Sequence, residues 1–347
     1  MKNFTIQENI SLASHTTIRL GGPARYFALC STVDEVKEGI QFANKKKLPL
    51  YILGGGSNTI FLDEGFSGIV LKIQISGIEK NKDMFIVKAG EVWDNFVLYA
   101  VQNNFAGIEC LSGIPGLIGA TPIQNVGAYG QEISETFFSA KVLNTENLEE
   151  EIFFKKNCHF RYRHSFFKEK HNAHYIITEV TFQLQENGNP IIHYPELQKY
   201  LENNFSSLTL HNVRDAVLTL RRKKSMVMDG NDKNTFSVGS FFLNPIISIT
   251  EFEKLVEQWK SDGFTEKIPT FPSEDKIKIP AAWLIEKSGF VRGYEKNGVG
   301  ISSNHTLALV NKGGTTKALL ELAYEIQEKV YKKFSLCLER EPIVVEK

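Results

Sequence analysis

The sequence lacks several features that would place the protein in a familiar class. It has only four cysteines, Cys30, Cys110, Cys158 and Cys337, and none of them form a C-x-x-C pair. This scarcity argues against a structural zinc site and against a disulfide framework, and it favours a reducing cytoplasm. The eight histidines show no ligand-like spacing with cysteine or acidic residues, so we assign no metal.

An excess of charge of one sign and long apolar runs are also missing. Lys and Arg total 40, as do Asp and Glu, so no global positive field would attract nucleic acid or a membrane surface. No stretch is long and apolar enough to span a bilayer. Residues 1–12 lack the cationic start and apolar centre of a signal peptide. We therefore expect a cytoplasmic protein without membrane insertion.

The length and the local patterns predict an α+β protein of more than one domain. A chain of 347 residues exceeds what one core usually sustains. Residues 31–47 predict a helix, because Thr32 and Glu35 form a capping box ahead of an apolar face that ends in three lysines. Short β-type runs are expected at 48–53, 68–73, 85–89, 140–144 and 175–184.

The pattern changes after about residue 245. Thr250 and Glu253 are spaced as a second capping box, ahead of a helix with Leu255 and Trp259 on one face. Another helix is expected over 281–288, begun by Pro280 and closed by Gly289, and a final helix over 317–334.

Three glycine-bearing stretches stand out, at 54–58, 111–120 and 121–130. Glycine lets backbone N–H groups come close to phosphate oxygens. Any one stretch alone is as consistent with a tight turn as with a ligand, but the three together favour a ligand. None matches the G-x-G-x-x-G fingerprint or the P-loop, so a Rossmann domain or a nucleotide triphosphatase is not supported.

Segments 15–24, 52–58 and 113–130 resemble the FAD-binding segments of UDP-N-acetylenolpyruvoylglucosamine reductases, and the resemblance extends over nearly the whole chain. It implies a vanillyl-alcohol-oxidase/PCMH-type fold: an FAD-binding domain over 1–220, with lobes at about 1–70 and 71–220, and a smaller α+β substrate domain over 221–325. Residues 326–347 would complete the last helix and form a tail that returns to the active site.

The resemblance also implies cofactors and a reaction. FAD would be bound non-covalently, NADPH would reduce it and leave, and UDP-N-acetyl-enolpyruvoylglucosamine would then take the hydride from flavin N5 at its terminal enolpyruvyl carbon. Protonation of the resulting enolate would give UDP-N-acetylmuramate, a precursor of peptidoglycan. We expect a monomer. The matching cofactor positions are Gly54, Gly55, Gly56, Ser57, Asn58, Ser112, Pro115, Gly116, Gly119, Ala120, Gln124, Asn125, Gly127 and Ala128.

Three positions match the family's catalytic residues. Arg163 would face the enolpyruvyl group, since a guanidinium is always charged and grips a carboxylate with two hydrogen bonds. Ser240 occupies the proton-donor position. Glu341 would help polarise the intermediate, but Pro342 departs from the family pattern and restricts Glu341 to extended conformations, so Glu339 is an alternative.

The substrate positions begin with the basic cluster 221–224, which is either a solvated charged face or a partner for the UDP diphosphate. The resemblance favours Arg221 and Lys224 as the pair that faces inward. Tyr194, which marks the subtype with a tyrosine loop, and Asn244 match further positions around UDP. Arg292 and His305 match more loosely.

Two other functions stay open. An oxygen-using flavin oxidase of the same fold commonly tethers FAD through a histidine near the first glycine segment, and residues 54–58 contain none. A non-catalytic module that binds a nucleotide sugar would be colourless, so visible absorption distinguishes it from a flavoprotein.

Overall fold

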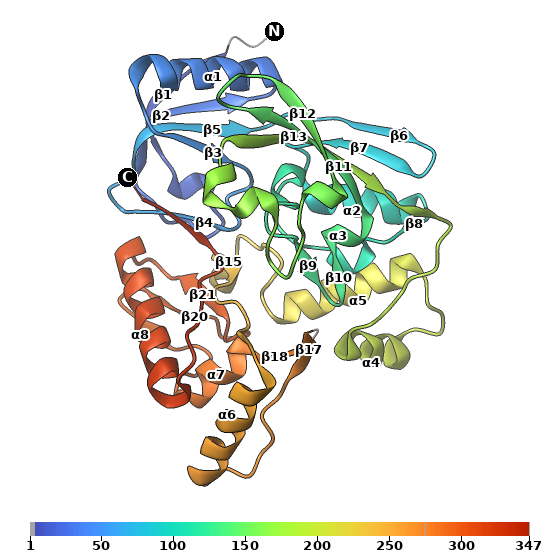
Figure 1. The fold of residues 1–347 in the computed structure, drawn as a ribbon, viewed down its shortest axis with the longest axis vertical. Helices are drawn as coiled ribbons and strands as arrows, with labels where there is room; N and C mark the ends of the chain where they lie inside the picture. Colours follow the sequence, from blue (N-terminus) through green and yellow to red (C-terminus); the bar gives the residue numbers. More distant parts are fainter. Residues whose placement is uncertain (1–3, 274, 347) are drawn as a thin grey trace.

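The computed structural model describes residues 4–273 and 275–346, and its N-terminal part is built on a small, mostly parallel sheet (Figure 1). The strands lie in the order β1 (Gln7–Ser11), β2 (Pro23–Cys30), β5 (Phe66–Ile73), β3 (Leu50–Leu53). The β2–β5 and β3–β5 pairs are parallel. β5 is apolar and mostly buried, as expected for the central strand of such a sheet.

Helix α1 (Val33–Lys46) covers one face of this sheet. Its Thr32–Glu35 capping box is present, as the sequence predicted. Gly39 allows a close approach, because a Cβ there would lie 2.5 Å from a methyl group of Leu71 on β5. The helix is therefore fixed against the strand by side-chain packing as well as by its cap.

The second sheet is antiparallel and has five strands, in the order β12 (Glu150–Phe154), β11 (Phe137–Asn144), β13 (Tyr175–Gln183), β7 (Met84–Lys88), β6 (Ile78–Asn81). Helix α2 (Trp93–Gln102) packs on it through aromatic rings: Phe96 contacts Phe85, and Trp93 contacts Phe182. This packing places the start of α2 close to the second glycine stretch.

Further elements lie between and after the strands of this sheet. They are β8 (Phe105–Ala106), β9 (Gly127–Ala128), β10 (Gln131–Glu132), α3 (Ile133–Thr136), β14 (Gln185–Glu186), α4 (Pro195–Asn204) and α5 (Leu210–Lys223). α4 and α5 pack on each other, and both lie beside the second lobe in Figure 1. Among residues 4–273 and 275–346, no helix has the length and apolarity needed to cross a membrane.

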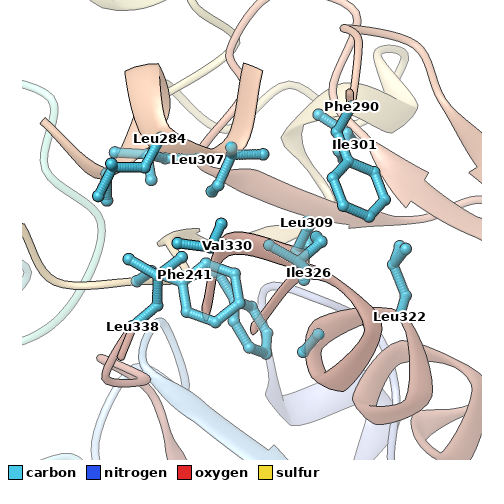
Figure 2. Packing of buried hydrophobic residues seen from close by; sticks show 14 of the residues in the cluster. Phe241, Leu284, Phe290, Ile301, Leu307, Leu309, Leu322, Ile326, Val330 and Leu338 are labelled. Carbon is cyan, nitrogen blue, oxygen red and sulfur yellow. The ribbon is translucent and has the colours of Figure 1, made fainter. Parts of the chain in front are cut away.

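The C-terminal part has its own hydrophobic core, shown in Figure 2. Its strands are β15 (Ser237–Ser240), β16 (Ile246–Ile247), β17 (Phe271–Ser273), β18 (Lys276–Lys278), β19 (Glu295–Lys296), β20 (Val299–Ile301) and β21 (Ala308–Asn311). Its helices are α6 (Ile249–Ser261), α7 (Ala281–Lys287) and α8 (Thr316–Phe334). Phe241, next to Ser240, is fully buried in this core.

The chain then returns to the N-terminal lobe. Strand β22 (Ile343–Val345) pairs in parallel with β4 (Thr59–Phe61), which directly follows the first glycine turn. Just before β22, Glu341 N–H donates to the Phe241 carbonyl (3.0 Å) and Leu243 N–H to the Glu339 carbonyl (2.9 Å). The tail thus lies between the strand that ends at Ser240 and the turn at 54–58, as Figure 1 shows for its red strand.

The predicted strands and the helices over 31–47, 281–288 and 317–334 are confirmed with small shifts at their ends. The predicted capping box at Thr250 and Glu253 is wrong. Ser248 is the N-cap of α6, and its hydroxyl accepts from Glu251 N–H while the Glu251 carboxylate accepts from Ser248 N–H. β16 ends at Ile247, so the chain enters the helix two residues earlier than the Thr250 spacing implies.

We expect Ser248→Ala to lower the free energy of unfolding by about 1 kcal/mol, because the first turn of α6 loses its cap. Thr250→Ala is the matched control and should change it by less than about 0.5 kcal/mol, since Thr250 is exposed and caps nothing. Urea unfolding of both variants measures the difference. A larger loss for Thr250→Ala would contradict the assignment of the cap.

Candidate active site

The three glycine stretches and the segment at 15–17 meet at one place. A Cβ added at Gly55 would lie 2.9 Å from Gly116 Cα, and one at Gly56 would lie 2.1 Å from the His15 carbonyl oxygen. Gly56 also has φ +65°, and its carbonyl accepts from Thr17 N–H at 3.1 Å. Backbone therefore packs directly on backbone on both sides of the 54–58 turn, which excludes larger residues at Gly55 and Gly56.

The backbone N–H groups of four residues in this turn are not paired within the described part of the chain. Within residues 4–273 and 275–346, the backbone amides of Gly55, Gly56, Ser57 and Asn58 donate no hydrogen bond to the protein. All four residues are partly or fully buried. Because buried amides are nearly always paired, successive free N–H groups in a turn form a site for an anion or for ordered water.

The second glycine stretch is fixed by helices α2 and α5. Trp93 Nε1–H donates to the Leu111 carbonyl (2.9 Å), and Gly113 N–H donates to Asp94 Oδ1 (2.6 Å). Arg214 on α5 forms a bidentate pair with Asp94, at 2.7 and 2.8 Å. Burial would raise the pKa of Asp94, but hydrogen bonds from Arg214 and Gly113 outweigh it and hold that pKa below its ordinary value.

Most of the other predicted cofactor positions lie around these turns. Ala120 faces Gly54, with 3.6 Å between its Cβ and a Cβ added at Gly54, and Gly119 packs on Ala89. Gly116 lies beside Ser57 Oγ, and Pro115 precedes it. Ser112 differs, because it is fully buried and its hydroxyl donates to the Glu109 carbonyl at 2.6 Å.

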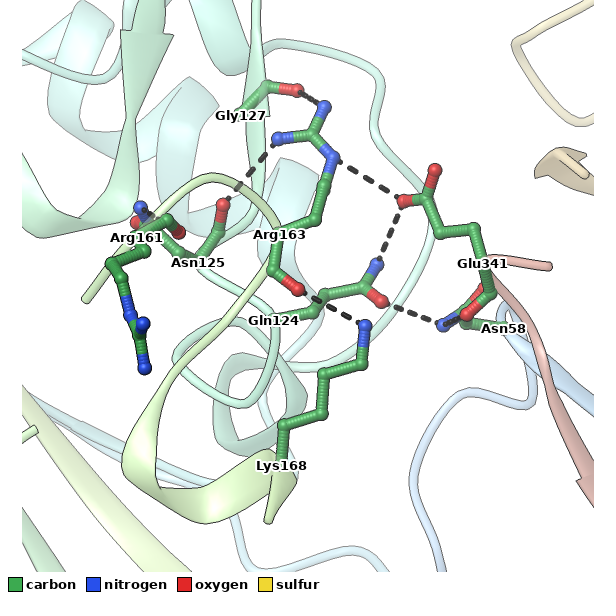
Figure 3. A network of polar contacts seen from close by, with 8 residues as sticks. All are labelled: Asn58, Gln124, Asn125, Gly127, Arg161, Arg163, Lys168 and Glu341. Atoms are coloured by element: carbon green, nitrogen blue, oxygen red, sulfur yellow. Dashed lines mark hydrogen bonds and ion pairs between the residues drawn. The ribbon is translucent and has the colours of Figure 1, made fainter. Parts of the chain in front are cut away.

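Arg163 lies at the centre of a polar network that reaches the C-terminal tail (Figure 3). Its φ is +51°, an uncommon conformation for a residue with a side chain. Its guanidinium donates to the Gly127 and Asn125 carbonyls, and its Nε lies 3.3 Å from Glu341 Oε1. Asn125 is itself held by its side chain, which donates to Glu132 at 2.7 Å. Ala128 follows Gly127 in β9.

Glu341 and Glu339 have different environments. The Glu341 side chain is 12% exposed, whereas Glu339 is exposed. Burial raises the pKa of Glu341 above its ordinary value of 4.5, and Arg163 and Lys168 oppose that shift without cancelling it. The structure thus brings Glu341, not Glu339, into contact with Arg163.

Ser240 is the last residue of β15 and is half-buried. Within residues 4–273 and 275–346 its hydroxyl makes no hydrogen bond. The preceding Gly239 has φ +76°, and a Cβ added there meets no atom within 4 Å. The backbone before Ser240 therefore borders open space on this side, which leaves room for a ligand.

A second group of predicted residues gathers around Tyr129, which the sequence analysis did not assign. The rings of Tyr129 and Tyr194 lie edge to face, with centroids 5.3 Å apart. Lys224 Nζ lies 5.7 Å from the Tyr129 ring centroid and 2.6 Å from Glu196. Tyr129 stands in the third glycine stretch, directly before Gly130. An aromatic residue within such a stretch is the sequence signal that could have identified it.

Arg221, His305 and Arg292 complete this group. Arg221 donates to the Met226 carbonyl (2.8 Å), and among the described residues its buried Nε has no partner. His305 Nδ1 accepts from Leu307 N–H (3.1 Å), and burial, with Lys224 and Arg292 nearby, lowers the pKa of His305 to about 4. Arg292 is largely exposed and lies 3.6 Å from Glu286. His305 is therefore neutral at physiological pH, with Nε2–H left to donate.

Asn244 caps helix α7, since its Oδ1 accepts from Ala281 N–H at 2.8 Å. Its side-chain amide therefore presents N–H groups on the other side. Lys278 lies over the Tyr162 ring, 4.4 Å from the centroid, and burial lowers the pKa of Lys278. Lys278 was not predicted from the sequence, because only the register of β18 places it near Arg163. Among the described residues, no group of three or more His, Cys, Asp or Glu is placed to hold a metal ion.

Comparison with known proteins places these features in a family. Residues 231–345 match the model for the C-terminal domain of UDP-N-acetylenolpyruvoylglucosamine reductase, and residues 24–147 match the model of an FAD binding domain. The chain is 42% identical to the UDP-N-acetylenolpyruvoylglucosamine reductase of Thermobifida fusca, over 97% of both chains. It is 40% identical to that of Streptomyces coelicolor, over 96% of this chain and 88% of the relative.

The fold agrees. The crystal structure of UDP-N-acetylenolpyruvylglucosamine reductase from Thermus caldophilus superimposes with a TM-score of 0.68 at 22% identity, over 99% of this chain and 100% of that one. Together with the match to an FAD binding domain, this confirms the predicted α+β fold with an FAD-binding domain.

The raised pKa of Glu341 has a consequence for stability. The folded protein keeps this proton to a higher pH than the unfolded chain does, so wild-type stability falls as pH rises from about 4.5 through the folded pKa. Relative to wild type, Glu341→Gln should therefore gain unfolding free energy across this window and level off above it. Urea unfolding from pH 4 to pH 8 measures the difference. A pH-independent difference, or one of the opposite sign, would contradict the shift.

Proposed function

Because the chain belongs to the family of UDP-N-acetylenolpyruvoylglucosamine reductases, we propose that it reduces UDP-N-acetyl-enolpyruvoylglucosamine to UDP-N-acetylmuramate, with FAD as cofactor and NADPH as the source of hydride. It is an FAD-dependent oxidoreductase of peptidoglycan synthesis. The observation that carries the proposal is the run of free amides from Gly55 to Asn58, which fits an anionic group, next to the buried pair of Arg163 and Glu341.

The residues around the glycine turns fit FAD. Four free amides in a glycine turn suit the two negative charges of its diphosphate. The amides of Gly55–Asn58 would hold the diphosphate, and Gly116, Gly119 and Ala120, which lie against or beside this turn, would line the same site. FAD bound there would supply the hydride for the enolpyruvyl carbon, after reduction by NADPH.

Arg163 would hold the substrate carboxylate. Glu341 and two backbone carbonyls already fix its guanidinium, and further N–H groups on its terminal nitrogens remain to donate. A fixed cation stabilises negative charge that develops on an enolate better than a mobile one does. Glu341, rather than Glu339, would complete this arrangement, because it lies against Arg163 while Glu339 is exposed.

Ser240 would donate the proton. Its hydroxyl has no partner among the described residues, and the adjacent open space at Gly239 allows a substrate carbon to approach. A serine hydroxyl is a weak acid, but an enolate carbon is a strong base, so a positioned weak donor suffices.

The UDP moiety would be bound by the residues around Tyr129. Lys224 supplies a cation for the diphosphate, Tyr194 and neutral His305 supply donors, and Asn244 presents its side-chain N–H groups. Arg221 and Arg292 add positive charge to the same region. Lys278 is a further candidate, as a half-buried cation beside Arg163.

We place this site between an FAD-binding domain over 1–220 and a substrate domain over 221–325, with the tail from 326 returning to it. We also propose that the protein acts as a monomer. Nucleotide sugars and NADPH are cytoplasmic metabolites, which supports action in the cytoplasm.

Flavin absorption tests the function directly. Under anaerobic conditions, NADPH should bleach the visible flavin band, and UDP-N-acetyl-enolpyruvoylglucosamine should restore it. In Ser240→Ala, bleaching should be unchanged and restoration slowed by about 100-fold or more, because only the proton donor is lost. A colourless protein would support a non-catalytic binding module, and restoration by admitted oxygen but not by the nucleotide sugar would support an oxidase. Normal restoration in Ser240→Ala would remove Ser240 from its role.

Two glycine variants test the diphosphate site. Gly55→Ala forces a Cβ to 2.9 Å from Gly116 Cα and should weaken FAD binding by about tenfold or more, equivalent to about 1.4 kcal/mol. Gly54→Ala is the control, because its Cβ would make an ordinary 3.6 Å contact with Ala120. Titration of the cofactor-free proteins, followed by flavin fluorescence, gives both affinities. Equal affinities would argue that FAD does not bind at this turn.

A further inference from the structure

Gln124 joins the first glycine turn to Glu341. Its Oε1 accepts a hydrogen bond from Asn58 Nδ2 at 2.7 Å, and its Nε2 lies 3.3 Å from Glu341 Oε1 (Figure 3). Asn58 also holds the tail directly: its Nδ2 lies 3.3 Å from the Glu341 carbonyl, and its own carbonyl accepts from Ile343 N–H at 3.0 Å. The residue that ends the glycine turn and the residue that bears the carboxylate are thus connected through one side chain.

The orientation of the Gln124 amide follows from these contacts. A flipped amide would place its nitrogen against Asn58 Nδ2 and its oxygen against Glu341 Oε1. Both contacts would then lack a proper donor–acceptor pair while Glu341 is ionised. In the orientation observed, both are satisfied. Gln124 therefore presents N–H, and not oxygen, to the carboxylate.

The same carboxylate oxygen also faces Arg163, whose Nε lies 3.3 Å from Glu341 Oε1. The titratable and charged groups around Glu341 are Arg163, Lys168 and Tyr162, all on the segment from 162 to 168. Two donors on Oε1 favour one orientation of the carboxylate plane and leave Oε2 to face other groups. Arg163 opposes the burial that raises the pKa of Glu341. A further N–H donor on a carboxylate oxygen also favours the ionised form, so the Gln124 amide acts in the same direction as Arg163.

We propose that Gln124 is a positioning residue for Glu341. It fixes the rotation of the carboxyl group and favours its ionised form, and it links this carboxyl group to the turn at Gly54–Asn58. This inference rests on the proposed function where it concerns catalysis. It goes beyond a role of Gln124 as a cofactor contact, because it predicts an effect on Glu341 that exists without any cofactor.

The tail offers a matched control in Gln327 on α8. Gln327 Nε2 donates to the Leu338 carbonyl (2.7 Å), and its Oε1 accepts from Arg340 at 3.1 and 3.2 Å. It anchors the same tail as Gln124 does, yet within the described part of the chain it forms no hydrogen bond with Glu341 or with the glycine turn. The Gln327→Met variant therefore shows the effect of a loosened tail on its own.

The experiment compares Gln124→Met, Gln124→Glu and Gln327→Met with wild type. Methionine keeps the length of glutamine but has no N–H group, and glutamate keeps an acceptor for Asn58 while placing a like charge against Glu341. The carboxyl titration of Glu341 is followed by ¹³C NMR in cofactor-free protein labelled at glutamate Cδ, and Glu341→Gln identifies the signal. FAD affinity and the rates of flavin reduction and reoxidation are measured in the loaded enzyme.

Both Gln124 variants should raise the pKa of Glu341, Gln124→Glu by more, and should slow reoxidation by about tenfold or more while reduction by NADPH stays close to wild type. Gln327→Met should change neither. The proposal is overturned if Glu341 titrates as in wild type in both Gln124 variants, or if Gln327→Met reproduces their effects. Loss of FAD affinity with an unchanged titration would leave Gln124 as a cofactor contact only. If wild type is not reoxidised by the nucleotide sugar, the proposed function fails, and the titration still decides this inference.

Discussion

The site depends on the close packing of backbone on backbone around the turn at 54–58. Gly55 meets Gly116 on one side and Gly56 meets His15 on the other, at distances that admit no side chain. The glycines are thus required by the protein's own packing. The same turn carries the amides of Gly55 to Asn58, which donate no hydrogen bond within the described residues. The packing thus explains these glycines as parts of tight turns, and binding of the FAD diphosphate by the same amides is our proposal.

The tail brings a buried carboxylate next to this turn. The parallel pairing of β22 with β4 and the hydrogen bonds of the tail to residues 241–243 fix its path over the last residues of the chain. One carboxylate on that path is buried beside an arginine. A buried ion pair contributes little net stability, because desolvation offsets the Coulomb attraction. The pairing of Arg163 with Glu341 is better explained by function, and the left-handed conformation of Arg163 is consistent with that, because strained residues gather at functional sites.

Local signals predicted the local structure, and long-range contacts decided the rest. The capping box at Thr32 and the Pro280–Gly289 pair located two helices, because such signals act within a few residues. At α6 two overlapping S/T-x-x-E spacings were present, and the end of β16 selected Ser248. The choice between Glu341 and Glu339 depends on strand pairing with residues distant in sequence, so the two remained open. Lys278 was not predicted for the same reason, because it enters the site through tertiary packing, whereas Tyr129 had a sequence signal in its place within the third glycine stretch.

The most direct test of the central claim is a crystal structure of the protein with FAD bound. The account predicts diphosphate oxygens within hydrogen-bond distance of the amides of Gly55, Gly56, Ser57 and Asn58. A structure with the diphosphate bound elsewhere, and with these amides contacting only water, would contradict it.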